Sequence, residues 1–88
     1  MVPIHEFESQ IWEVEGIRVI VRAPWDLHVK SYPYKNALNE RKTVKKWVCD
    51  RVEPCLEDQQ VVVIKGDGKH CHGGTSLKNA RASYRSAI

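Results

Sequence analysis

Residues 11–22 read IWEVEGIRVIVR, with apolar side chains recurring at alternate positions on both sides of Glu15-Gly16. A period of two is typical of strands, and a glycine at the second position of a two-residue turn supplies the positive φ that such turns need. The same register pairs Glu13 with Arg18, two opposite charges on one face. We therefore predict a β-hairpin whose apolar face is made of Trp12, Val14, Ile17, Val19 and Val21.

A second strand is predicted at residues 60–65. Four consecutive β-branched residues at 61–64 precede the turn signal Gly66-Asp67-Gly68. Such an uninterrupted run is typical of a strand buried on both faces, so we expect it at the centre of the sheet. A chain this short offers little cover for two faces, and a homodimer is therefore expected to complete the burial. Residues 27–30 are expected to form a short edge strand.

The main helix is predicted at about residues 40–53, and Pro54 ends it. Its start stays open, because Asn36, Asn39 and Thr43 are all suitable N-caps. One stripe at helical spacing identifies the buried side. That stripe consists of Val44, Trp47, Val48, Arg51, Val52 and Cys55.

The C-terminal segment predicts a second, short helix. Thr75 can cap it, and Leu77, Ala80 and Tyr84 then share its apolar side. The order of elements does not alternate strictly between strands and helices, which indicates an α+β fold. We expect a small antiparallel or mixed sheet, formed by the N-terminal hairpin and the central strand 60–65. This sheet packs against one main helix, and the 88 residues form one domain, 1–88.

Cysteine usage and hydropathy bear on the compartment. The three cysteines are an odd number in a short chain, which argues against a disulfide framework. The acidic N-terminal segment lacks the apolar stretch of a signal peptide, and no apolar run approaches the roughly 20 residues that span a bilayer. We expect a cytoplasmic protein with reduced thiols.

Charge is distributed unevenly along the chain. The net charge of +3 combines −2 for residues 1–40 with +5 for residues 41–88. On the main helix, basic residues precede Asp50 and Glu53, which is opposite to what the helix dipole favours and costs about 0.3–1 kcal/mol per misplaced charge. This pattern indicates a basic face for an acidic partner, with an ordinary solvated surface as the alternative. The candidate residues are Arg41, Lys42, Lys45, Lys46, Lys69, Lys78, Arg81 and Arg85.

Aromatic residues supply a second set of candidates for partner binding. Tyr32 and Tyr34 stand on either side of Pro33 and are expected at the surface, where tyrosine is common in interfaces. For Trp25, a core position and a surface position are equally open. Trp12 and Trp47 fall on predicted apolar faces and are expected in the core.

A metal site is considered at His70, Cys71 and His72, because imidazole and thiolate are the usual zinc ligands. Three consecutive residues in extended chain cannot easily converge on one ion, since alternate side chains point apart. Zinc is therefore the weaker interpretation, and no cofactor is expected. The glycine-rich loop before Thr75 lacks the lysine of a phosphate-binding loop, which leaves at most a simple anion site at the helix N-terminus.

No nucleophile-elbow serine and no pair of catalytic carboxylates stands out, so we do not expect an enzyme. The favoured hypothesis is a protein-interaction module, a regulator or inhibitor that docks on a larger complex. That complex can be made of protein alone or of protein and nucleic acid. Small chains of this kind are common among phage and mobile-element accessory proteins. The alternative hypothesis is direct nucleic-acid binding through lysine and arginine contacts to phosphate.

Overall fold

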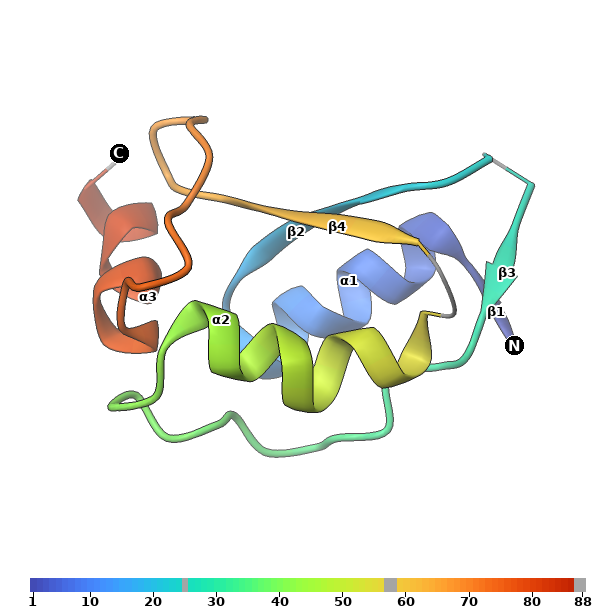
Figure 1. Ribbon diagram of the computed structural model, residues 1–88, viewed down its shortest axis with the longest axis horizontal. Coiled ribbons are helices and arrows are strands. Elements are labelled where there is room, and N and C mark those ends of the chain that lie inside the picture. Colours follow the sequence, from blue (N-terminus) through green and yellow to red (C-terminus); the bar gives the residue numbers. More distant parts are fainter. Residues whose placement is uncertain (25, 57–58, 87–88) are drawn as a thin grey trace.

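The computed structural model describes residues 1–24, 26–56 and 59–86. Within these ranges, three α-helices combine with two antiparallel sheets of two strands each, which confirms the α+β class. Figure 1 shows the β2–β4 ribbon lying over α1 and α2, with α3 at one end and the β1–β3 pair at the other. The strands are Val2–Pro3 (β1), Arg18–Arg22 (β2), His28–Val29 (β3) and Gln60–Ile64 (β4). The helices are Ile4–Glu15 (α1), Val44–Trp47 (α2) and Leu77–Ser86 (α3).

The predicted hairpin is wrong, because its first half belongs to α1, the longest helix. Phe7, Ile11 and Glu15 are buried at spacings of four residues, so the helical period rules this segment. Gly16 takes φ 69° and ψ 30° as the residue that ends the helix, and its N–H donates to the Trp12 carbonyl. A glycine with positive φ serves a helix C-terminus as well as a hairpin turn, which explains the misreading.

The partner of β2 is β4 rather than a neighbouring strand. The two run antiparallel, with Val19 opposite Val63 and Val21 opposite Val61. Val19, Val21 and Val63 are buried toward the helices, whereas Ile20 faces outward and is 49% exposed. The predicted strand at 60–65 is thus confirmed, but its expected burial on both faces is wrong. The prediction of a homodimer depended on that burial, so the strand no longer provides a reason for it.

The predicted edge strand at 27–30 is confirmed as β3, which pairs with β1.

The predicted main helix begins later than residue 40. Thr43 is its N-cap and accepts the Lys46 N–H, and the helical path runs from α2 through a π-helical segment, Val48–Val52, to a 3₁₀ turn at Glu53–Cys55. Trp47 and Val52 are fully buried, so the predicted stripe is confirmed.

The C-terminal helix α3 is confirmed with Leu77 and Ala80 buried, but Ser76 and not Thr75 holds the Asn79 N–H at 3.2 Å. It packs tightly against the turn after β4. A Cβ on Gly66 would lie 2.1 Å from the Ser83 carbonyl oxygen, so only glycine fits there. The buried apolar side chains of all these elements form one cluster. No helix of the described residues is long and apolar enough to cross a membrane.

Candidate interaction surfaces

A buried carboxylate organises the interior. Glu15 is 1% exposed at the end of α1, and its Oε2 accepts the Tyr32 hydroxyl at 2.5 Å and Arg51 Nη1 at 2.8 Å. Its Oε1 accepts the Leu38 N–H at 2.9 Å and Arg81 Nη2 at 3.0 Å. Two guanidinium groups therefore face one carboxylate, and the bonds satisfy every oxygen lone pair that burial removed from water.

The same bonds fix the electrostatics of this network. Burial by itself raises the pKa of Glu15, but hydrogen bonds from Tyr32, the Leu38 N–H and Arg51 outweigh it and hold the pKa below its usual range. Burial and the bond to Glu15 raise the pKa of Tyr32. Glu15 is therefore ionised and Tyr32 neutral near pH 7.

Three residues that were predicted to bind a partner are instead part of this network or packed against it. Tyr32 was expected at the surface but is 6% exposed, and its hydroxyl also accepts Trp47 Nε1 at 3.1 Å. Tyr34 is half-buried and lies under the Arg51 guanidinium, 4.2 Å from its ring centre. Arg81 donates to Glu15 and to the Leu38 carbonyl. Each of these side chains is occupied by contacts within the chain.

An aromatic face surrounds the exposed Trp12 of α1, and sequence reasoning missed it. Trp12 was expected in the core but is 42% exposed, and it stands beside Ile20. The Tyr84 ring meets the indole edge-on at 5.2 Å, and the Arg18 guanidinium lies 5.6 Å from its centre. We use the term aromatic face for Trp12, Arg18, Ile20 and Tyr84.

Tyr84 holds this face rigid. Its hydroxyl accepts the Arg18 N–H at 2.8 Å and donates to the Ile64 carbonyl, so it lies between the paired residues at the end of the β2–β4 ladder. Two open hollows share Trp12 and Arg18 as a wall, with volumes of about 360 and 420 Å³. Trp12 is thus a fixed ridge between two depressions.

A basic surface forms where α2 and α3 begin. Thr43 and Ser76 form a bridge, the Leu77 N–H donates to the Lys42 carbonyl, and the Lys78 N–H donates to the Glu40 carbonyl. These bonds bring together cations that are far apart in sequence. We define the basic surface as Arg41, Lys42, Lys45, Lys46 and Lys78, all exposed.

Other predicted cations lie elsewhere. Lys69 is exposed in the turn after β4, and Arg85 is exposed in the last turn of α3. Trp25 lies outside the described residues. The predicted binding residues therefore do not form one surface: five are gathered, three serve the interior and two stand apart.

The side chains of His70, Cys71 and His72 do not converge on a common point that could hold a metal ion. His70 and His72 are exposed, whereas Cys71 is 2% exposed and points inward. His72 Nδ1 is already an acceptor for the Gly74 N–H at 3.0 Å. Within the described ranges, no three His, Cys, Asp or Glu side chains lie close enough to hold an ion. The alternation of side chains along the chain explains this result.

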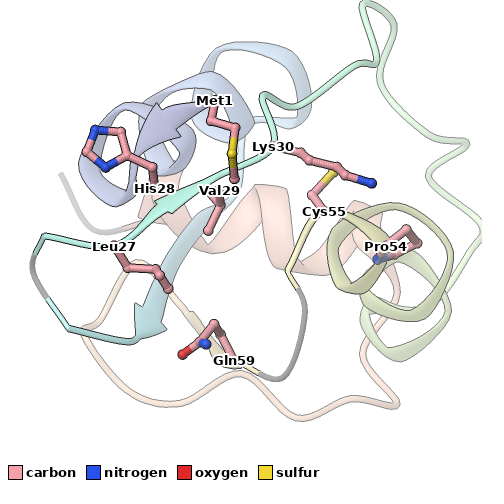
Figure 2. Close-up of a pocket in the computed structure, with 8 residues that line it drawn as sticks. All are labelled: Met1, Leu27, His28, Val29, Lys30, Pro54, Cys55 and Gln59. Carbon is pink, nitrogen blue, oxygen red and sulfur yellow. The ribbon is translucent and has the colours of Figure 1, made fainter.

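A small pocket of about 280 Å³ lies between the β1–β3 end and the turn that follows α2 (Figure 2). Figure 2 shows the Cys55 sulfur beside the Lys30 stem and the His28 ring turned away from both. Burial raises the pKa of Cys55, only partly opposed by Lys30, which makes the thiol a weak nucleophile near neutral pH.

The chain matches no family model, and neither the curated proteins nor the solved structures contain a significant match to it.

Proposed function

We propose that the protein is a small non-enzymatic interaction module, a regulator or inhibitor that docks on a larger complex. The observation that carries this proposal is the exposed Trp12, pinned between Tyr84 and Arg18 and next to the exposed Ile20. Tryptophan, tyrosine and arginine dominate the binding energy of protein interfaces. A side chain that is already fixed also loses little conformational entropy on binding.

The aromatic residues proposed to contact the partner are therefore those of the aromatic face and not the loop tyrosines Tyr32 and Tyr34. Tyr32 is buried and Tyr34 is covered by Arg51, so neither can anchor a partner. Trp12, in contrast, separates two hollows, and a partner can wrap around the indole and place side chains in both. An apolar anchor with a cation beside it and polar residues around it is the usual anatomy of an interface centre.

Affinity capture from lysate of the source cells, with nuclease present, followed by titration of the purified retained protein, tests this proposal. We expect Trp12→Gln and Ile20→Gln each to weaken binding at least about 10-fold, which corresponds to about 1.4 kcal/mol. Glu53→Gln, an exposed change in the 3₁₀ turn after α2 and outside the aromatic face, is the matched control and leaves binding unchanged. A retained partner that binds the Trp12→Gln/Ile20→Gln double variant with full affinity would rule out the aromatic face.

A further inference from the structure

The starts of α2 and α3 satisfy each other's backbone. The N–H groups of Val44 and Lys45 donate to the Thr75 and Gly73 carbonyls, which belong to the loop before α3. In return, the Leu77 and Lys78 N–H groups donate to the loop before α2. The next donors go to the Thr43 and Ser76 side chains.

This exchange decides what kind of anion could bind here. The backbone donors that cradle a phosphate at a helix N-terminus are already used, so the anion site considered for the loop before α3 lacks its donors. Any anion must be held by side chains. The side chains available are the exposed cations of the basic surface.

The arrangement of positive charge at the basic surface does not stabilise the fold of the free protein. Two helix N-termini, each with partial positive charge, lie together under five cations. Of the nearby carboxylates, Asp50 offsets Lys46 at 3.4 Å and Glu40 lies in the loop before α2. A surplus of positive charge remains, and it destabilises the fold unless a negatively charged partner compensates it.

The chemistry of the surface favours phosphate over a protein partner. The apolar residues at the two helix starts, Val44 and Leu77, are 2% and 0% exposed, so neither is an exposed apolar anchor among the cations. The centre of a protein interface is usually depleted in charged residues, whereas lysine and arginine suffice to bind a phosphate backbone. Aromatic side chains for base stacking lie on the aromatic face instead.

We propose that the basic surface binds the phosphate backbone of a nucleic acid without reading its bases. The contacts are charge-assisted hydrogen bonds from Arg41, Lys42, Lys45, Lys46 and Lys78. Binding releases counterions, so affinity falls steeply with salt. The surface is separate from the aromatic face, and the inference does not rest on the interaction proposed there.

Titration of a labelled mixed-sequence DNA duplex of about 20 base pairs, at about 50 to 200 mM salt, tests the inference. The test variant is Lys42→Gln/Lys45→Gln/Lys78→Gln, and the control is Lys30→Gln/Lys35→Gln/Lys69→Gln, which removes equal charge elsewhere. We expect the wild type to show a slope of log K against log salt of about −4.5, and the test variant to show about −1.8. Its affinity at low salt falls at least about 30-fold, while the control loses less than about 3-fold.

A second measurement separates a binding role from damage to the fold. Because the three lysines crowd two helix N-termini, the test variant melts at a higher temperature than the wild type, by about 4 °C or more, in the absence of DNA. Trp12→Gln/Ile20→Gln leaves DNA binding unchanged, so failure of one proposal is distinct from failure of the other. Equal loss in test and control, no binding at low salt, or tighter binding of polyglutamate than of DNA would each overturn the inference.

Discussion

Helix α1 buries a carboxylate and exposes an indole only three residues apart. Glu15 is 1% exposed and Trp12 is 42% exposed, the reverse of what their side chains ordinarily prefer. The interior exception is fully compensated: in the described part of the chain, every buried side-chain nitrogen or oxygen has a hydrogen-bond partner. The surface exception is only partly compensated, because Trp12 stays 42% exposed despite its contacts with Tyr84 and Arg18. We infer that Glu15 serves the fold and that Trp12 serves a partner.

The largest effect is expected from Glu15→Gln. The amide keeps the shape but leaves Arg51 and Arg81 half-buried without a counter-charge, and breaking such a buried pair costs about 3–5 kcal/mol. Urea unfolding measures the loss, and Glu13→Gln on the exposed side of the same helix is the control, with a change below about 0.5 kcal/mol. A loss below about 1 kcal/mol for Glu15→Gln would show that the network does not hold the fold.

The same residue predicts how stability depends on pH. The pKa of Glu15 is lower in the folded state than its ordinary value of 4.5. Its contribution is therefore fully present above pH 4.5 and is lost as the pH falls through the lower folded-state value. We expect the unfolding free energy of the wild type to drop more steeply below pH 4.5 than that of Glu15→Gln. Parallel curves for the two proteins would contradict the assignment.

This network also explains where prediction from the sequence stopped. Along α1 the apolar spacing runs through Phe7 and Ile11 and then meets a charge at Glu15, so the stripe looks broken. The residues that make Glu15 suitable for burial, Arg51 and Arg81, lie 36 and 66 positions away. Local periodicity cannot contain that information, and it therefore favours the competing strand pattern.

Other elements were predictable because their signals are local. The run at 61–64 and the stripe at 44–55 each identify their element without knowledge of any distant partner. The pairing of β2 with β4, in contrast, joins segments about 40 residues apart. The aromatic face is equally hard to predict from the sequence. It forms only because α1 is a helix, because Tyr84 of α3 contacts Trp12, and because β2 pairs with β4.

An intermediate effect is expected from Tyr32→Phe. The change removes a hydroxyl that donates to Glu15 and accepts from Trp47, so a buried carboxylate oxygen and an indole N–H each lose a partner. We expect a loss of about 1–3 kcal/mol in urea unfolding. Tyr34→Phe is the matched control, since the contacts of Tyr34 with Arg51 and Tyr32 are made by its ring. Equal losses in both variants would mean that the Tyr32 hydroxyl, despite its bonds to Glu15 and Trp47, contributes no more to stability than the hydroxyl of Tyr34.

The smallest effect on stability is expected from Trp12→Gln. The variant loses an edge-on contact with Tyr84 and a cation–π contact with Arg18 at an exposed site, together about 1 kcal/mol. Urea unfolding measures it beside Trp47→Phe, which opens a cavity at a fully buried site and is expected to cost more, about 2 kcal/mol or above. If Trp12→Gln were the more damaging change, the indole would belong to the core. A small loss instead means that stability alone does not explain an exposed tryptophan held in place by two contacts, which is the result that the proposed role in partner binding requires.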